Sequence, residues 1–457
     1  MSHLENIASF IAREDLSIPQ AAIERAKLAL VDFVGVAIAG SVEPVSKIVT
    51  THVSRRASGN ASVIGADFRT DATDAALANA TLGHALDFDD SSFVLGGHPT
   101  VTMIPALLAV GQESNSSGRE ILEAYVVGFE VMMKLSRAVN FEHYEKGWHP
   151  TATLGTFGTA AAVARLLRLP AGIVGHALGL AASMSSGVKA NFGSMAKPFQ
   201  VGHASQKGVV CAQLAADGLT ASPEALEGRQ GFLEVYNGAG KYRAEELSAF
   251  GETLEILNSS GLMFKQYPCC GATHAPIDAA RELARTQPFA ASDIESITIA
   301  MNKRRVTHVD RPVVTTGLEG KFSIQYTLAA ALADGEIGLR HFTEAALARN
   351  DLKALTARVK AIGIDEGESL SQACELTVTL KGGGTRSVRR DDAEGRDADD
   401  YPGYMAAKFM DCVEQVHDRG FADSLLPQLI AFDTCENADA VISRLGRSSA
   451  NRRGNSA

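Results

Sequence analysis

The chain has 457 residues, enough for two or three domains, and its net charge is −10. Because 46% of the residues are hydrophobic and only 21% are charged, the composition excludes an intrinsically disordered chain. The acidic balance, without a long basic run, argues against nucleic acid or an anionic membrane as partner. Small molecules or other proteins are the expected partners.

The N-terminal segment Met1–Leu16 carries acidic residues within its first apolar stretch and lacks the charge order of a secretory signal, so we expect a cytoplasmic location. The most apolar region, Thr151–Val188, contains Arg165 and Arg168, which argues against a membrane-spanning helix. The six cysteines include no C-x-x-C pair, so we expect reduced thiols and neither a metal clip nor an iron–sulfur cluster.

From Pro19 to Thr220, apolar residues recur at the three- and four-residue spacing of buried helices. The expected helices are Pro19–Ala39 with Gly40 as its end, Asp74–Ala85, Ile104–Glu113, Glu120–Val139, Thr151–Leu167, Ala171–Ser186 and Gln200–Ala216. Several contain glycines, which let helices approach closely: Gly128, Gly155, Gly158, Gly175 and Gly179. This region therefore predicts a tight all-α bundle.

The pattern changes near Lys265. Ser296–Asn302 and Glu375–Leu380 alternate apolar and polar residues at period two, and a glycine-rich turn before Arg386–Arg389 predicts a hairpin. Helices are expected between and after these strands, at Ala275–Thr286, Lys321–Ala333, Thr343–Arg349 and Tyr404–Val416. The predicted fold is mainly α: a large all-α helical-bundle domain over 1–265 and 401–446, an inserted smaller α+β domain over 266–400, and a flexible tail over 447–457.

The densest group of chemically useful residues runs from His84 to Ser91 and continues to His98 and Thr100. Three carboxylates within Asp87–Asp90 cannot all be buried and ionised cheaply, so at least one should face a cleft or a cation. Glycines before His98 allow a sharp loop that could aim its imidazole for acid–base work. A cluster of helix caps and loop residues is an equally good interpretation of the spacing alone.

Three further groups carry candidate residues. Tyr144 and Trp148 precede His149 at the predicted start of a helix, where free N–H groups attract carboxylates. Lys197 lies in an otherwise uncharged stretch, and we expect Lys197-Pro198 to break the helix and place the cation in a loop. Lys265–His274 spans the change of pattern, where a cleft between domains would lie. Each residue alone is more often structural than functional.

Together these segments resemble the MmgE/PrpD family, which includes 2-methylcitrate dehydratase, cis-aconitate decarboxylase and iminodisuccinate epimerase. The resemblance rests on HALDFDDS with GGHPT, GWHPTATLGTFG, MAKPFQVGHASQKG, KQYPCCGATHA and GKFSIQYTLAAALADG, which cover most of Asp74–Gly335 in the family's order. It implies a helical domain completed by C-terminal helices, an inserted α+β domain, and an active site between them. It also implies a small polycarboxylate substrate, no metal, flavin or nucleotide cofactor, and, with the Ala/Gly-rich helices, a homodimer.

Carried over by motif, the resemblance implies five catalytic residues and two that bind substrate. The catalytic candidates are Asp87, His98, His149, Lys197 and His274, and the substrate-binding candidates are Ser91 and Tyr144. Ser91 stands where cis-aconitate decarboxylases have Thr. Asp89 stands where methylcitrate dehydratases have Asn, a departure that weakens an exact dehydratase assignment.

The mechanism expected from this resemblance is proton transfer at a carbon next to a carboxylate, by a lyase of the dehydratase or decarboxylase type. His98 and His149 would exchange protons, Lys197 would hold a carboxylate, Asp87 would orient a histidine, and His274 would close the site. Three alternatives stay open: an epimerase of an iminodisuccinate-like dicarboxylate, a non-catalytic family member, and a metal-dependent hydrolase. The last would use metal ligands from His84, Asp87, Asp89, Asp90 and His98.

Overall fold

The structure is a computed structural model that describes residues 1–365, 372–392 and 401–446. It is mainly α-helical, which confirms the predicted fold class at that level. The described residues also form a four-stranded mixed sheet and a two-stranded ribbon. The tail predicted over 447–457, and most of the acidic loop that precedes Tyr401, lie outside the described residues.

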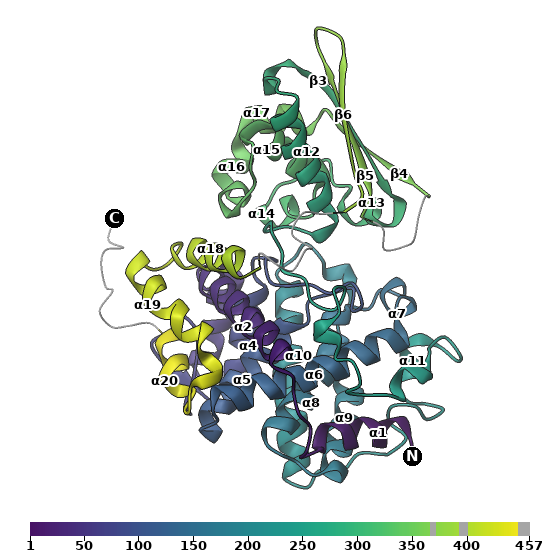
Figure 1. Ribbon diagram of the computed structural model, residues 1–457, viewed down its shortest axis with the longest axis vertical. Helices are drawn as coiled ribbons and strands as arrows, with labels where there is room; N and C mark the ends of the chain where they lie inside the picture. Colours follow the sequence, from purple (N-terminus) through teal and green to yellow (C-terminus); the bar gives the residue numbers. More distant parts are fainter. Residues whose placement is uncertain (366–371, 393–400, 447–457) are drawn as a thin grey trace. The chain divides into compact units, whose positions relative to one another are not determined.

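The chain divides into two compact units, drawn mainly in purple, blue and yellow (unit 1) and in green (unit 2) in Figure 1. Unit 1 contains Met1–Ala85, Asp89–Phe264 and the chain from Tyr401, and unit 2 contains Leu86–Phe88 and the chain from Lys265 to Asp400. Each unit has a hydrophobic core of its own. The assignment of Leu86–Phe88 to unit 2 has no counterpart in the predicted division of the chain.

Unit 1 is built from helices and one short antiparallel ribbon. Its helices are α1 (His3–Ala12), α2 (Gln20–Gly40), α3 (Pro44–Ser54), α4 (Ala72–His84), α5 (Thr100–Ser114), α6 (Gly118–Val139), α7 (Glu142–Glu145), α8 (Pro150–Leu166), α9 (Ala171–Met184), α10 (Ala196–Ala216), α11 (Phe232–Asn237), α18 (Tyr401–Val413), α19 (Arg419–Ile430) and α20 (Asp439–Ile442). The ribbon pairs β1 (Ala61–Ser62) with β2 (Arg69–Thr70).

The helices predicted for this part of the chain are confirmed, with ends that differ by a few residues. Caps explain where two of them begin. Asp71 precedes α4 and accepts hydrogen bonds from the backbone N–H groups of Thr73 and Asp74. Ser117 and Glu120 form a capping box at the start of α6. The sequence interpretation missed α1, α3 and α19, which have 10 to 12 residues each, and the shorter α7, α11 and α20.

Close helix packing accounts for most of the glycines in these helices. The helix α10 packs against α4 and α8, and α8 packs against α6. A Cβ atom on Gly128 of α6 would lie 2.6 Å from the Cβ of Ala162 and from the carbonyl oxygen of Gly158, so only glycine permits this approach. Gly175 is the exception among those predicted, because a Cβ there would meet nothing within 4 Å.

The C-terminal helices return to the N-terminal part of the chain. Both α18 and α19 pack against α2, and Figure 1 shows them in yellow beside the purple α2. A buried ion pair joins α18 to α2, with Nζ of Lys408 2.6 Å from Oδ1 of Asp32. No single helix in the described part of the chain is long and apolar enough to cross a membrane. Only α2 and α3 taken together, bent by 90°, reach that threshold.

Unit 2 is a mixed sheet with helices. Its elements are α12 (His274–Thr286), β3 (Ile294–Asn302), α13 (Lys303–Val309), α14 (Gly317–Gly320), α15 (Ile324–Asp334), α16 (Glu344–Ala348), α17 (Asn350–Thr356), β4 (Val359–Ile364), β5 (Cys374–Leu380) and β6 (Thr385–Arg390). The strand order is β4-β3-β5-β6, with β4 parallel to β3 and the other pairs antiparallel. The predicted strands and hairpin are confirmed. The strand β4 was not predicted, and its residues do not alternate between buried and exposed along the strand.

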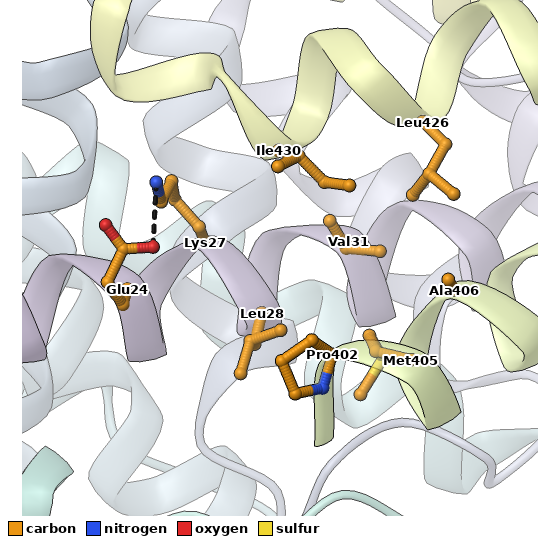
Figure 2. A pocket seen from close by; sticks show the side chains of 9 residues that line it. All are labelled: Glu24, Lys27, Leu28, Val31, Pro402, Met405, Ala406, Leu426 and Ile430. Atoms are coloured by element: carbon orange, nitrogen blue, oxygen red, sulfur yellow. Dashed lines mark ion pairs between the residues drawn. The ribbon is translucent and has the colours of Figure 1, made fainter. Parts of the chain in front are cut away.

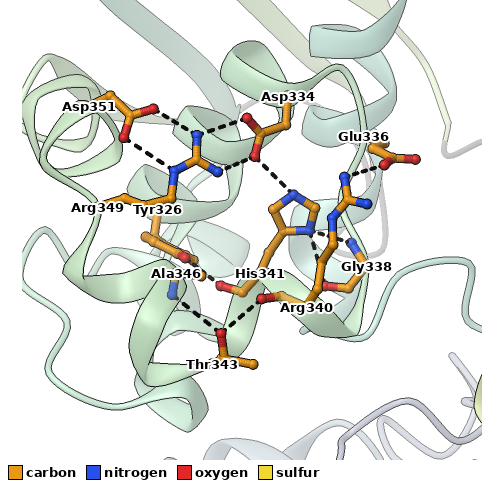
Figure 3. A network of polar contacts seen from close by, with 10 residues as sticks. All are labelled: Tyr326, Asp334, Glu336, Gly338, Arg340, His341, Thr343, Ala346, Arg349 and Asp351. Carbon is orange, nitrogen blue, oxygen red and sulfur yellow. Dashed lines mark hydrogen bonds and ion pairs between the residues drawn. The ribbon is translucent and has the colours of Figure 1, made fainter. Parts of the chain in front are cut away.

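Alternation in β3 and β5 directs one row of side chains into the core of unit 2. Ile297 lies opposite Val378 and Ile299 opposite Leu376, and all four are fully buried. A polar network at the C-terminal end of α15 ties the helices together (Figure 3). Asp334 accepts hydrogen bonds from the Arg349 guanidinium at 2.6 and 2.9 Å and lies 3.1 Å from Nε2 of His341. Pairing with Arg349 lowers the pKa of Asp334.

Candidate functional site

The carboxylates of the loop after α4 are all buried, and each is accommodated differently. Asp87, Asp89 and Asp90 are at most 2% exposed. Asp89 lies between two histidines, Asp90 contacts hydroxyl groups, and Asp87 pairs with a lysine of unit 2. We expected at least one of these carboxylates to face a cleft or a cation. Asp87 faces the ammonium group of Lys265, and none of the three is exposed to solvent.

Asp89 contacts two imidazole rings within unit 1. Nδ1 of His84, the last residue of α4, lies 3.0 and 2.9 Å from the two carboxylate oxygens. Nδ1 of His98 lies 3.2 Å from Oδ2 of the same carboxylate. The two rings meet edge to face, with centroids 4.5 Å apart. An ionised carboxylate only accepts hydrogen bonds. Nδ1 of His84 therefore carries a proton and donates a hydrogen bond to Asp89.

The charge states of this group follow from burial and neighbouring charge. Burial alone would raise the pKa of Asp89, but the adjacent His84 and His98 outweigh it and hold that pKa far below its ordinary value. Burial lowers the pKa of His84 to about 4, assisted by the charges of Lys197 and His98 and opposed by Asp89. At neutral pH the carboxylate is therefore ionised and His84 is neutral.

Asp90 is the carboxylate that is not needed as an anion. Burial, together with the nearby charge of Asp32, raises its pKa well above the ordinary value, which favours its protonated form. The Thr100 hydroxyl contacts its Oδ2, and the same hydroxyl lies 2.6 Å from the Tyr125 hydroxyl. Asp90, Thr100 and Tyr125 thus form a buried chain of hydrogen bonds.

The loop that carries His98 is shaped by two glycines, as predicted. Gly96 has a φ of +64°, a conformation that favours glycine. A Cβ on Gly97 would lie 2.5 Å from Oγ1 of Thr151, so the absence of a side chain lets the loop rest on the start of α8. There the backbone N–H of His98 donates to the same Thr151 hydroxyl at 3.0 Å.

His149 is the N-cap residue of α8 and is 1% exposed. Its Nδ1 lies 2.9 Å from the amide oxygen of Gln200, which can only accept, so Nδ1 carries a proton. Burial, followed by the charge of Lys197, lowers the pKa of His149 well below its ordinary value. A neutral ring with a protonated Nδ1 leaves Nε2 as the basic nitrogen. The His149 and His84 centroids are 6.3 Å apart.

Lys197 corrects one prediction. Instead of breaking a helix, Lys197-Pro198 lies in the first turn of α10, where a proline is tolerated because its missing N–H has no helical acceptor. Lys197 is 3% exposed, and its Nζ lies 5.3 Å from the centroid of the Phe192 ring. Its charge acts on both His84 and His149. Unit 1 therefore brings together His98, His149 and Lys197 among the predicted residues.

Asp87 and His274 belong to unit 2. Asp87 has a φ of +53°, and Nζ of Lys265 lies 3.1 Å from its Oδ2 and donates to its carbonyl oxygen at 2.7 Å. Lys321 donates from Nζ to the carbonyl oxygen of Leu86. Two buried ammonium groups thus hold consecutive carbonyl groups of this segment. The histidine-orienting role was predicted for Asp87, yet within unit 1 the carboxylate that contacts two histidines is Asp89.

His274 begins α12 and lies under the Lys265–Cys270 turn. Its Nε2 is 3.3 Å from the carbonyl oxygen of Cys269, and its ring meets the Tyr267 ring edge to face at 5.2 Å. Burial raises the pKa of the Cys269 thiol to about 12, so this cysteine stays protonated.

The two predicted substrate-binding residues both lie in unit 1. Ser91 is fixed through its backbone, which exchanges two hydrogen bonds of 2.8 Å with Met263. Tyr144 lies on α7 beside Gly96, and its ring lies 3.3 Å from Nζ of Lys189. The Lys189 ammonium also donates to the Tyr144 carbonyl at 2.9 Å.

Sequence reasoning gave His84 of unit 1 only a possible metal-ligand role, and it gave no role to two buried lysines of unit 2, Lys265 and Lys321. All lie inside motifs that the sequence analysis quoted, and each is at most 4% exposed. A usable signal was available, because a lysine or histidine inside an apolar stretch that folds into a core must find a partner there.

Donor types for a divalent metal are present in this group. The candidate ligand atoms of His84, Asp89 and His98 lie within 4.8 Å of one another. Asp90, proposed as a further ligand, instead accepts a hydrogen bond from the backbone N–H of Thr100, and burial raises its pKa. The positive charge of Lys197 acts on His84 and disfavours a second cation beside it.

An apolar pocket of about 160 Å³ lies elsewhere in unit 1, between α2, α18 and α19 (Figure 2). Its charged lining residues are Glu24 and Lys27, which pair at 2.8 Å, and the other lining residues are apolar. None of the predicted site residues lines it. Its one cationic lining residue, Lys27, is already paired with a carboxylate, so the pocket offers no cation of its own to bind a polycarboxylate.

Comparison with known proteins matches both parts of the chain. Residues 5–245 match the MmgE/PrpD N-terminal domain and residues 267–424 match the MmgE/PrpD C-terminal domain. The cis-aconitate decarboxylase of Mus musculus is 30% identical over 384 residues, which cover 81% of this chain and 78% of that protein. That of Homo sapiens is 29% identical over 382 residues, with the same coverage of 81% and 78%. That of Aspergillus terreus (strain NIH 2624 / FGSC A1156) is 30% identical over 364 residues, covering 74% of this chain and 72% of that protein.

Proposed function

The chain belongs to the MmgE/PrpD family, and on that premise we propose that it is a lyase that releases CO2 from a small polycarboxylate such as cis-aconitate. Three relatives named as cis-aconitate decarboxylases support decarboxylation over the other reactions considered. Loss of water from 2-methylcitrate is the second candidate, because the family resemblance includes dehydratases.

One observation carries the proposal: in unit 1 the buried histidines His84, His98 and His149 come together with a buried lysine, Lys197, and His84 is hydrogen-bonded to an ionised carboxylate. Loss of CO2 leaves negative charge on a carbon next to a remaining carboxylate, so the reaction needs a cation for that charge and an acid that protonates the carbon. Lys197 is the candidate cation, and His98 is the candidate acid. His149 is neutral with a basic Nε2, which suits a proton acceptor.

The electron and proton movements are the same for any substrate of this class. The carbon–carbon bond to the departing carboxylate breaks, its electron pair stays on the substrate next to another carboxylate, and a proton from His98 forms the new C–H bond. His98 then regains a proton from water. In dehydration, by contrast, a base removes the C–H proton and the acid protonates the leaving hydroxyl.

The experiment that tests this function incubates EDTA-treated protein in deuterated water with citrate, 2-methylcitrate, cis-aconitate and iminodisuccinate, followed by proton NMR. We expect cis-aconitate to lose CO2 and give an itaconate-like product with deuterium at the newly protonated carbon. A new olefin from 2-methylcitrate indicates a dehydratase, and deuterium incorporation without net change indicates an epimerase. A folded protein that changes none of these acids contradicts the proposal.

Two companion measurements make the result specific. His149→Ala should lower kcat by about 10²-fold or more, the usual size of an acid–base contribution, while the far-UV circular dichroism stays unchanged. A kcat within a few fold of wild type removes His149 from the mechanism. Stoichiometric metal in the purified protein, with activity lost in chelator, favours the metal-dependent hydrolase instead.

A further inference from the structure

Asp89 is placed between His84 and His98 in a way that a simple ion pair does not require. Its Oδ2 is shared, lying 2.9 Å from Nδ1 of His84 and 3.2 Å from Nδ1 of His98. All three side chains are buried, with His98 the most exposed of them at 8%. A carboxylate facing Nδ1 of a ring stabilises the proton on that nitrogen and fixes the orientation of the ring.

We propose that Asp89 and His84 are positioning residues that keep the proton of His98 on Nδ1, so that Nε2 is the nitrogen that exchanges a proton with the substrate. The inference rests on the proposed lyase function, in which His98 is the acid. Asp89 acts on His98 directly, and His84 acts by holding the carboxylate with its Nδ1–H. Neither residue donates a proton to the substrate.

The step balances without any further reactant. Before reaction His98 carries protons on both nitrogens, and its Nδ1 lies 3.2 Å from Oδ2 of Asp89. As the carbon–carbon bond to CO2 breaks, the Nε2 proton moves to carbon and the ring becomes the neutral Nδ1–H tautomer. A proton from water restores the imidazolium, and the Asp89 carboxylate stays ionised throughout.

The protein contains its own example of a buried histidine that is only structural. His143 is fully buried, like His84, but its ring nitrogens face neutral groups, Oδ1 of Asn237 at 3.2 Å and Oγ1 of Thr153 at 2.7 Å. His143→Gln is therefore a matched control for the loss of a buried, hydrogen-bonded imidazole. Asp74→Asn is the matched control for carboxylate to amide, because Asp74 is buried and paired with Arg56 through 3.0 Å contacts.

The kinetic test compares Asp89→Asn with these controls. The amide keeps the size of the side chain, but its NH2 group facing His98 requires an unprotonated Nδ1, which gives the wrong tautomer. We expect kcat to fall by about 10²- to 10⁴-fold with KM changed by less than about threefold. His84→Gln, which retains an N–H donor, should lose about 10-fold, whereas His143→Gln and Asp74→Asn should stay within a few fold.

A second readout does not depend on activity. Nitrogen-15 NMR of the labelled histidines in the wild-type protein above pH 8 should show His98 protonated at Nδ1, its signal being assigned by its loss in His98→Gln. In Asp89→Asn the proton should move to Nε2. A wild-type His98 protonated at Nε2 overturns the proposal, and so does an Asp89→Asn enzyme whose kcat lies within threefold of wild type. An inactive wild-type protein contradicts the proposed function instead, which separates the two failures.

Discussion

At the scale of single residues, burial rather than residue type decides what each acidic or basic group can do. Asp89 and Asp90 are neighbours with equal exposure, yet the pKa of Asp89 is lowered beside two imidazoles and the pKa of Asp90 is raised by burial and the charge of Asp32. The same desolvation acts on both, so the difference comes from their neighbours. Of these two carboxyl groups, Asp89 is the one that contacts imidazole nitrogens.

This contrast gives a physical meaning to one departure from the family pattern. The sequence comparison placed Asp89 where methylcitrate dehydratases have Asn. In this chain Asp89 is the residue that contacts two histidines. An amide cannot supply the negative charge that stabilises a proton on Nδ1 of His98. We therefore infer that the departure changes the electrostatics of the site and not only its shape.

Buried histidines should also make the protein sensitive to acid. Burial lowers the pKa of His143 to about 4, below its ordinary value of 6.5. Between these values the unfolded chain binds the proton and the folded protein does not, so the free energy of unfolding falls as the pH drops from 6.5 to 4. This residue contributes roughly 3 kcal/mol or less of that loss.

Urea denaturation of wild type and His143→Gln at several pH values between 4 and 7 measures this contribution. The variant should lose less stability across the window than wild type does. The exposed His52 supplies the control, because His52→Gln should keep the wild-type dependence. Equal slopes for His143→Gln and wild type would contradict the assignment of a neutral His143.

At the scale of secondary-structure elements, the ends of helices supply the candidate residues. His84 ends α4, His149 caps α8, and Lys197 lies in the first turn of α10. Helix ends hold side chains near free backbone groups and are positioned by the packing of whole helices, which makes them more rigid than long loops. The close contacts of α10 with α4 and α8 thereby fix the distances among these three residues.

The ion pair between α2 and α18 is expected to matter for stability because it is buried. Lys408 and Asp32 have side chains at most 2% exposed, and burial raises the pKa of Asp32 although Lys408 opposes it. Lys408→Met leaves this carboxylate without its ammonium partner, which should cost about 3 to 5 kcal/mol in the free energy of unfolding. Combining it with Asp32→Asn should recover part of that loss, because the uncompensated charge is gone.

Fluorescence of the single tryptophan, Trp148 in unit 1, reports this unfolding in urea. Arg419→Met is the control, since its pair with Asp423 on α19 is exposed and separated by 3.9 Å. It should change the free energy of unfolding by less than about 1 kcal/mol. If Lys408→Met and Arg419→Met lower the free energy of unfolding by similar amounts, the buried pair contributes no more to stability than an exposed one.

At the scale of the whole molecule, the chain contains two units with separate hydrophobic cores. Leu376 of β5 is fully buried in unit 2, and Leu178 of α9 is 1% exposed in unit 1. Replacing either with Ala should cost about 2 to 5 kcal/mol through lost burial and the cavity left behind. Hydrogen exchange followed by mass spectrometry should show the largest acceleration for Leu376→Ala in β3 and β5, and for Leu178→Ala in α9 and the helices it contacts. The reverse distribution would contradict the division of the core.

Much of the architecture could be predicted from local pattern. The 3.6-residue spacing and cap residues located α2, α4 to α6 and α8 to α10, and alternation located β3, β5 and the hairpin to β6. Prediction failed where neighbours distant in sequence decide the structure. The edge strand β4 is defined by its parallel pairing with β3, more than sixty residues away. Lys197 was predicted to lie in a loop, because the packing of α10 against α4 and α8 leaves no signal in the neighbouring sequence.

The sequence by itself determined the helical and sheet regions, the family motifs, and therefore the residue types available for acid–base chemistry. Only the tertiary structure decided which of those residues meet and which charge states are favoured, as in the sharing of Asp89 by His84 and His98, the raised pKa of Asp90, and the burial of Lys197. The physical reason is that desolvation and charge–charge interaction depend on all atoms within a few ångströms, and these come from segments far apart in the chain.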